Sequence, residues 1–310
     1  MEPQALSAAS PAGERPGAYR ALGILFAIIG VACFSLRPGF IKLAYAYVTD
    51  PVTLIALRML VSLPFFIAAA LWSQRRGELA PISTRDRWSI LGLGCLGYYF
   101  SSFADFLGLQ YVSAGLGRLI MFLYPTMVVV LSALFLAKRP TRRELASLAL
   151  SYGGITLVLA HAIDGQNANL PLGAALVFAS GLGYAIYLVA GSGVVQRVGS
   201  VRFTAYAMTV SSVACILQFL LLRPLSALDL PAPVWWLALA IGTLSTALPT
   251  FLTAEALRRV GANQVALVGS LGPLITIAFG WLGLGESLGA WQLVGAGLVL
   301  AGVMLVSLRK

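Results

Sequence analysis

The chain carries very few charged residues. Of its 310 residues, 10% are Asp, Glu, Lys or Arg, whereas 59% are hydrophobic. Soluble domains carry about a quarter charged residues, so a chain this poor in charge could not cover its surface in water. The composition excludes an ordinary soluble protein and predicts one whose outer surface faces the hydrocarbon of a bilayer.

Residue types that bind metals or form disulfides are also scarce. The chain has one histidine, and its three cysteines, Cys33, Cys95 and Cys215, each lie alone in an apolar stretch. This pattern gives neither a metal-ligand spacing nor a disulfide framework. The Gly-x-Gly-x-x-Gly at 92–97 lies inside an apolar run without a preceding strand, so it indicates close helix packing. We therefore predict no metal and no cofactor, and no ATP-driven pump within this chain.

The sequence contains many long runs of apolar residues. Each is close to the roughly 17–25 residues that a spanning helix needs, and none alternates as a barrel strand would. Residues 1–19 precede them and are expected to form a disordered cytoplasmic tail. The sequence thus predicts an all-α integral membrane protein with ten transmembrane helices, near 21–37, 51–73, 88–109, 113–136, 144–162, 171–192, 203–222, 234–256, 262–284 and 289–308.

The basic residues predict the orientation. With the N-terminus in the cytoplasm, Arg223 is the only Lys or Arg that falls on the outer side, apart from four basic residues within or at the edge of spans, Arg37, Lys42, Arg58 and Arg118. Cytoplasmic loops carry such an excess of basic residues, so both termini are predicted to be cytoplasmic, in the cell (inner) membrane. The formal net charge of +10 then reflects topology and attraction to anionic lipid, and no nucleic-acid partner is predicted.

The chain also repeats itself. A shift of 148 residues places "LQYVSAGLGRLIMFLYP", ending at Pro125, on "LRRVGANQVALVGSLGP", ending at Pro273. Five spans per half is an odd number, so the halves, 20–162 and 163–310, are predicted to be inverted repeats. Secondary transporters are commonly built this way, with the substrate site between the halves.

The second half resembles an EamA domain of the drug/metabolite transporter superfamily. The resemblance lies in "GSLGPLITIAFGWLGLGESLGAWQLVGAGLVLAGVML", with Glu286 in the family's "lgE" motif; the first half has Lys138 at that position. This resemblance implies two five-helix EamA-like repeats. It also implies that the protein is a transporter of small metabolites, such as amino acids or organic acids, and not an enzyme. Export by alternating access is the usual mode, and a homodimer is possible. A passive facilitator or channel of the same fold is the alternative.

Charges inside the spans are candidate functional residues because they are costly in a bilayer. Asp105 and Arg118 flank a short outer turn and are expected to pair, while Arg37 adds positive charge that would attract an anionic or zwitterionic substrate. Arg58 is interpreted as reaching the outer headgroups. Breaks at Pro125 and Pro273 are expected to mark the site or a hinge. The other residues expected to line the substrate pathway are Tyr98, Ser102, Phe122, Tyr184, Tyr187, Ser245 and Thr246.

A remote alternative is a membrane-embedded serine hydrolase. Residues 285–289 read Gly-Glu-Ser-Leu-Gly, the pattern of a nucleophile elbow, and His161 and Asp164 could complete a triad. An elbow requires a strand–turn–helix, whereas two spans flank this segment, and the chain order is not Ser, Asp, His. The segment is interpreted as a turn between helices, with Ser287 near the start of the last one.

Overall fold

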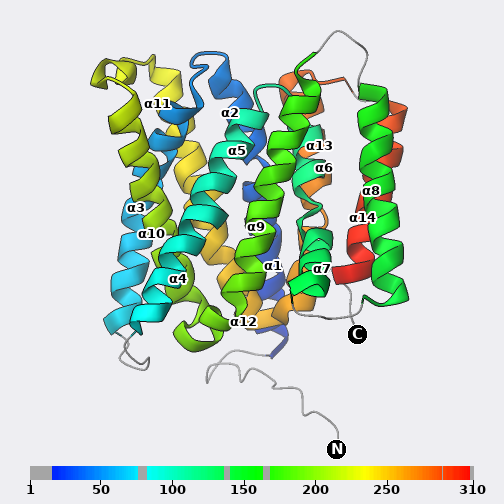
Figure 1. Cartoon of the computed structure of the whole chain (residues 1–310), viewed down its shortest axis with the longest axis horizontal. Helices are drawn as coiled ribbons and strands as arrows, with labels where there is room; N and C mark the ends of the chain where they lie inside the picture. Colours follow the sequence, from blue (N-terminus) through cyan, green and yellow to red (C-terminus); the bar gives the residue numbers. More distant parts are fainter. Residues whose placement is uncertain (1–15, 76–81, 136–139, 163–167, 288, 308–310) are drawn as a thin grey trace, which may run out of the picture.

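The computed structural model describes residues 16–75, 82–135, 140–162, 168–287 and 289–307, and all regular elements in these segments are helices (Figure 1). In chain order they are α1 (Pro16–Ser35), α2 (Arg37–Tyr45), α3 (Pro51–Arg75), α4 (Thr84–Gly94), η1 (Cys95–Phe100), α5 (Ser101–Gly108), α6 (Ala114–Met121), α7 (Tyr124–Phe135), α8 (Arg142–Ala162), α9 (Leu170–Val198), α10 (Ser200–Leu222), η2 (Leu225–Leu228), α11 (Ala232–Gly242), η3 (Thr243–Ala247), α12 (Leu248–Gly269), α13 (Gly272–Leu284) and α14 (Ala290–Ser307).

These elements form a multi-pass membrane protein. Within the described segments, nine helical stretches are long and apolar enough to cross a bilayer, and α14 adds a shorter apolar stretch, Ala290–Leu305. Helix α1 begins at Pro16, so residues 16–19 of the expected tail are helical. The rest of that tail lies outside the described residues.

Two spans are broken at matching positions. The fourth span divides into α6 and α7 at Phe122 and Leu123, and the ninth divides into α12 and α13 at Ser270 and Leu271. Proline is tolerated in the first turn of a helix, where its missing N–H would have no partner in any case. The two prolines predicted to break these spans are the second residues of α7 and α13, so each begins a new helical segment.

A second pair of irregularities has the same spacing. The third span contains the π-helical turn η1, starting at Cys95, and the eighth contains η3, starting at Thr243, 148 residues later. A π-helical turn shifts the direction of the side chains that follow and is frequent at functional sites. The repeat detected in the sequence therefore extends to the local irregularities of the backbone.

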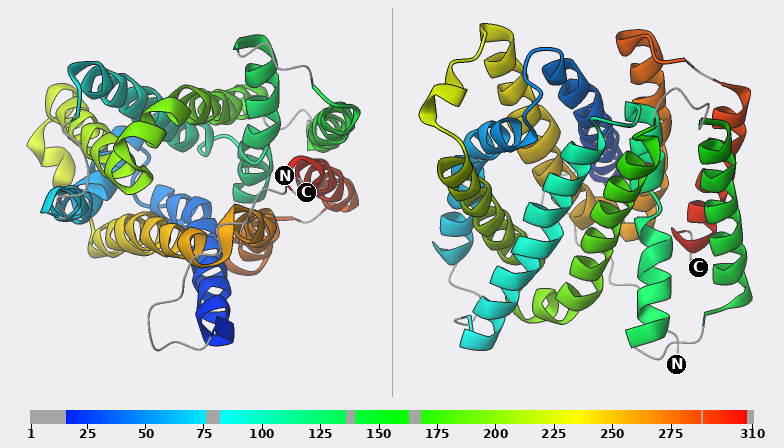
Figure 2. Two further views of the ribbon diagram at one scale, coloured as in Figure 1. Left: turned by 90° about the horizontal axis from the view of Figure 1, so that it is seen from below. Right: turned by 45° about the horizontal axis from the view of Figure 1, so that its top comes forward.

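Helices α8 and α14 pack as a pair at one edge of the bundle (Figure 2). Their contact is close because glycines face each other: a Cβ atom on Gly295 would lie 2.6 Å from the carbonyl oxygen of Gly154. Small residues permit this approach of two backbones in membranes. The rest of the chain surrounds a central space, in which the candidate site lies.

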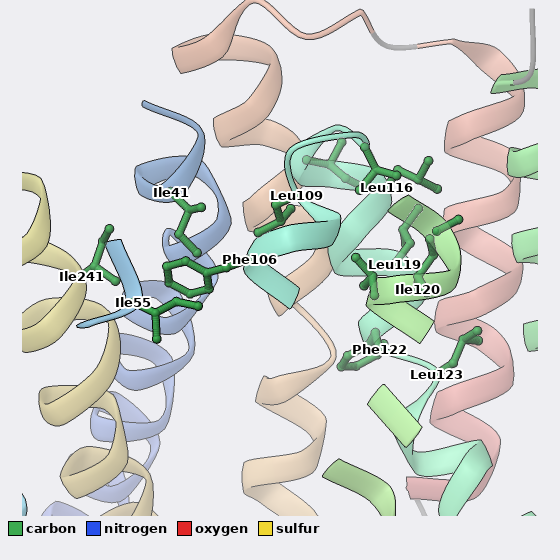
Figure 3. Close-up of a cluster of buried hydrophobic side chains, with 14 of the residues drawn as sticks. Ile41, Ile55, Phe106, Leu109, Leu116, Leu119, Ile120, Phe122, Leu123 and Ile241 are labelled. Atoms are coloured by element: carbon green, nitrogen blue, oxygen red, sulfur yellow. The ribbon is translucent and has the colours of Figure 1, made fainter. Parts of the chain in front are cut away.

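A buried apolar cluster joins helices of both halves (Figure 3). Ile41 of α2, Ile55 of α3 and Phe106 of α5 are at most 1% exposed and pack together with residues of α6 and α11. The cluster as a whole also continues to Leu131 of α7 and Val303 of α14.

Candidate functional site

A cavity of about 580 Å³ lies among α1, α3, α5, α6, α9, α10 and α12. Pockets that bind small ligands have volumes of roughly 300–1,000 Å³. On α10 and α12 the lining continues to Ser200 and Leu257, toward the end of the bundle that holds both termini. Its polar and aromatic side chains include Phe34, Arg37, Arg58, Tyr98, Ser101, Ser102, Asp105, Arg118, Phe122, Tyr124, Tyr184, Thr246, Thr250 and Thr253.

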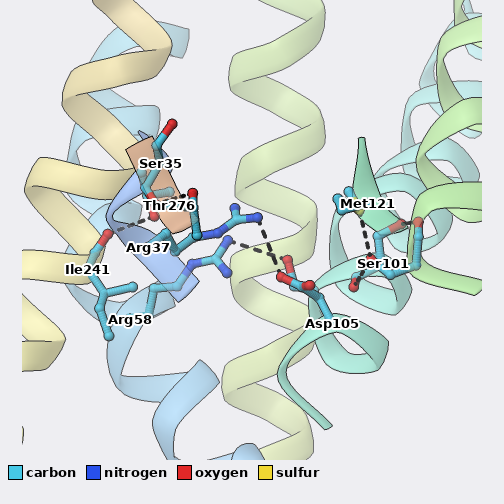
Figure 4. A network of polar contacts seen from close by, with 11 residues as sticks. Ser35, Arg37, Arg58, Ser101, Asp105, Met121, Ile241 and Thr276 are labelled. Carbon is cyan, nitrogen blue, oxygen red and sulfur yellow. Dashed lines mark hydrogen bonds and ion pairs between the residues drawn. The ribbon is translucent and has the colours of Figure 1, made fainter. Parts of the chain in front are cut away.

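Charged side chains gather at the end of this cavity that is farther from Ser200 and Leu257 (Figure 4). The guanidinium of Arg37 lies 3.5 Å from the carboxylate of Asp105, and both residues are buried. Arg58, which is 2% exposed, donates a hydrogen bond of 3.3 Å to the hydroxyl of Ser102. With Arg118, the cavity holds three arginines and, among its described lining residues, one acidic residue.

Two of the expected roles are wrong. Asp105 forms its ion pair with Arg37 and not with Arg118, because the start of α2 brings Arg37 across the bundle to α5. Arg58 does not reach a headgroup region, since its side chain is buried and packs 5.3 Å from the ring of Phe106. The charge of all three arginines therefore acts on the cavity.

Aromatic rings form a wall beside these charges. The ring centroids of Tyr124 and Tyr184 lie 5.2 Å apart, and those of Tyr98 and Tyr184 lie 6.2 Å apart, both edge to face. Aromatic pairs prefer this geometry. The three tyrosines line the cavity and are called the tyrosine wall below.

Most of the residues predicted to line the pathway do line the cavity, together with Pro125. Tyr187 lies behind the tyrosine wall, where its ring stacks on Phe203 at 5.3 Å, and Ser245 is fully buried but is not a lining residue. Sequence reasoning missed Phe34 and Tyr124. Their aromatic character was visible, but the break in the first span at Leu36 was not predicted. A signal for it exists, because Pro38 is the second residue of α2, as Pro125 and Pro273 are of α7 and α13.

An ion pair joins two loops at the end away from the termini. The guanidinium of Arg223 lies 2.9 Å from the carboxylate of Asp50, which also accepts hydrogen bonds from Thr53. Burial opposes ionisation of Asp50, but the hydrogen bonds from Arg223 and Thr53 outweigh it and hold the pKa of this carboxyl below its usual value. The pair ties the loop after α2 to the end of α10.

Glu286 joins the two halves at the same end. The left-handed turn at Gly285 (φ 67°) ends α13, and the Glu286 carboxylate then accepts from the amides of Ala114 at 2.7 Å and Gly115 at 3.3 Å. The hydroxyl of Ser113 accepts from the next amide, Leu116, at 3.1 Å. The first amides of α6, which a helix leaves without partners, are thus satisfied partly from the other half of the chain.

We expect Glu286→Ala to reduce stability by about 1–3 kcal/mol, because two partly buried amides lose their acceptor. The measurement is thermal unfolding of the purified protein. Glu144→Ala is the matched control, since Glu144 accepts from the amide of Thr141 at 2.7 Å in an exposed cap at the start of α8. Equal losses in the two variants would contradict a special role for the contact between the halves.

The segment that resembles a nucleophile elbow has no strand before it in the described residues. Helix α14 begins at Ala290, so Ser287 lies in the connection after α13 and not at the helix start. The Nδ1 atom of His161 lies 2.9 Å from the carbonyl oxygen of Leu157, and its ring stacks on Trp291 at 4.3 Å. Asp164 lies outside the described residues.

A bundle of apolar spans around a buried, charged cavity defines a membrane protein of the transporter class. The chain belongs to the EamA-like transporter family, which matches residues 21–160 and again 171–308. The family domain is therefore present twice, as the internal repeat predicted.

Individual relatives agree with this class. The chain is 30% identical to the uncharacterized transporter YcbK of Bacillus subtilis (strain 168), over 94% of both chains. It is 29% identical to the threonine/homoserine exporter RhtA of Escherichia coli (strain K12), over 69% of this chain and 68% of that one. A solved crystal structure with 18% identity superposes with a TM-score of 0.64, covering 92% of this chain and 98% of the other, which supports the fold.

Proposed function

We propose that this protein is a secondary transporter that exports small anionic or zwitterionic metabolites, such as amino acids or organic acids, across the cell (inner) membrane. Transport proceeds by alternating access between two inverted repeats of five spanning helices each, with both termini in the cytoplasm. The similarity to RhtA, whose name describes an exporter of threonine and homoserine, supports export of a compound that carries a carboxylate.

The observation that carries the proposal is that matching positions of both halves line one cavity. Positions that are 148 residues apart contribute to it from both halves: Tyr98 and Thr246, Ser101 and Pro249, Ser102 and Thr250, Asp105 and Thr253, and Met121 and Gly269. Matching positions of two repeats can meet in one cavity only if the axis that relates the repeats passes through it. Transporters with inverted repeats bind their substrate at that interface.

The described lining of the cavity extends to residues near one end of the bundle, Ser200 of α10 and Leu257 of α12. This is the end that holds the termini, whereas the part of the apolar cluster around Phe106, the Asp50–Arg223 pair and the Glu286 contact lie at the other end. With the termini in the cytoplasm, this is an inward-facing state, ready to take a substrate from the cell interior.

An exchange experiment tests this function without knowledge of the substrate. Proteoliposomes are loaded with an unlabelled mixture of amino acids and organic acids, and the same mixture labelled with ¹³C is added outside. We expect at least one labelled compound to enter faster into loaded than into empty vesicles, measured by mass spectrometry, because a carrier returns faster with substrate bound. Entry at equal rates would indicate a passive facilitator, and entry no faster than into protein-free vesicles would contradict transport.

A further inference from the structure

Arg118 is a buried cation without a matching anion. It is 8% exposed, its Nε atom has no hydrogen-bond partner, and its guanidinium lies 4.6 Å from the ring centroid of Phe34. Asp105, the one acidic residue of the described cavity lining, forms its ion pair with Arg37. An unpaired charge of this kind is costly in a protein interior unless a ligand supplies the opposite charge.

The beginning of α13 faces the same guanidinium. A Cβ atom on Gly272, the first residue of α13, would lie 3.4 Å from an Nη atom of Arg118, and no side chain caps this helix. A helix N-terminus carries partial positive charge and free amides, which bind anions. Two positive groups, one from each half of the chain, thus meet at the break of the ninth span. In transporters with broken helices, such ends point at the anionic group of the substrate.

We propose that Arg118 and the N-terminus of α13 bind the carboxylate of an aromatic organic anion, whose ring packs on the tyrosine wall. This assignment rests on the proposed transport function and names its substrate class. It concerns compounds with a net negative charge, not zwitterionic amino acids, because the acid that could bind an ammonium group is held by Arg37.

The tyrosine wall lies close enough to receive the rest of such a molecule. Arg118, Tyr124 and Tyr184 line the same cavity, and the third member of the wall, Tyr98, packs against Tyr184 at 6.2 Å. Offset and edge-to-face contacts between rings are favourable beyond the burial of area. The cavity of about 580 Å³ has room for an aromatic carboxylate.

Binding of four matched probes to the purified full-length protein, measured by calorimetry, tests the assignment. 3-Phenylpropionate has the ring and the carboxylate, 3-phenylpropionamide lacks the charge, phenylalanine adds an ammonium group and butyrate lacks the ring. We expect 3-phenylpropionate to bind at least about tenfold more tightly than each of the others, a difference of about 1.4 kcal/mol. Equal or tighter binding of phenylalanine or butyrate would overturn the assignment.

Variants separate the two contacts. Arg118→Gln should remove the preference for the acid over its amide, whereas Tyr184→Leu should keep that preference and lose the one over butyrate. Gly272→Val crowds Arg118 without removing a charge, so it should weaken binding of 3-phenylpropionate but not of 3-phenylpropionamide. This variant replaces Arg118→Gln in the test if Arg118→Gln fails to fold. Arg87→Gln, which removes an exposed arginine of α4 outside the cavity, should leave all four affinities unchanged. An unaltered acid-to-amide ratio in folded Arg118→Gln or Gly272→Val would refute the site.

The exchange experiment distinguishes this assignment from the transport function itself. If labelled compounds other than aromatic anions exchange and 3-phenylpropionate neither binds nor exchanges, the substrate class is wrong and transport stands. If 3-phenylpropionate binds with the expected dependence on Arg118 but no compound exchanges, the site is correct and transport is contradicted.

Discussion

Asp105→Asn should destabilise the protein by about 3–5 kcal/mol, the usual cost of removing one partner from a buried ion pair. Asp105 pairs with Arg37 and is the one acidic residue among the described lining residues, so its neutral replacement leaves a cavity with three buried arginines and no carboxylate. The measurement is unfolding of the purified protein by heat or denaturant. The double variant Asp105→Asn/Arg37→Gln should recover part of the loss, because one of the unbalanced charges is then absent.

Asp50→Asn provides the control for this prediction. The Asp50–Arg223 pair is shorter, 2.9 Å against 3.5 Å for Asp105–Arg37, but its side chains are 25% and 39% exposed, against 7% and 11%. Exposed pairs contribute little to stability because water and salt screen them. Asp50→Asn should therefore have the smaller effect although its bond is shorter. If it proved equally or more destabilising, burial would not govern the strength of these pairs.

Gly295→Val should separate α14 from α8 and lower stability by about 1–3 kcal/mol or more, as overpacking does. The added side chain would meet the carbonyl oxygen of Gly154, a backbone atom that can move away only if the helix moves. Gly297, two residues further on the same helix, has nothing within 4 Å of an added Cβ atom. Gly297→Val is thus a control with the same chemical change, and thermal unfolding of both variants makes the comparison. A similar loss in the two would indicate a general effect of valine in α14 and not a contact with α8.

The sequence predicted the spans and their breaks because the signals are local. Long apolar runs have few alternatives to a spanning helix, and Pro125 and Pro273 each mark the start of a helical segment. The register of 148 residues, read from the sequence around these prolines, also relates η1 to η3. That relation could not be predicted from residue types, since π-helical turns depend on packing around them.

The partners of the charges could not be predicted in the same way. Asp105 and Arg118 are close in sequence, and a short turn joins their helices, so local reasoning pairs them. The observed partner, Arg37, is 68 residues away from Asp105 and reaches it because the first span breaks at Leu36. From the sequence, Arg58 was expected to extend to the lipid headgroups, but the packing of α3 in the bundle leaves only 2% of this residue exposed. Such contacts depend on the arrangement of helices, which periodicity alone does not specify.

Glu286 makes the two ends of this protein unequal. The carboxylate accepts hydrogen bonds from the amides of Ala114 and Gly115, and the proposed opening of the end away from the termini would require it to release them. The residue in the matching position of the first half is Lys138, whose ammonium group has no oxygen to accept such bonds. In the alternating-access cycle that we propose, Glu286 therefore forms a contact between the halves that a lysine cannot form by accepting hydrogen bonds, and we expect the equilibrium between the two states to favour the one in which this contact is made. In that cycle we expect a ligand from the side of the termini to meet a site that is already available, whereas one from the opposite side should bind with an apparent affinity reduced by the low population of the state in which Glu286 has released the amides.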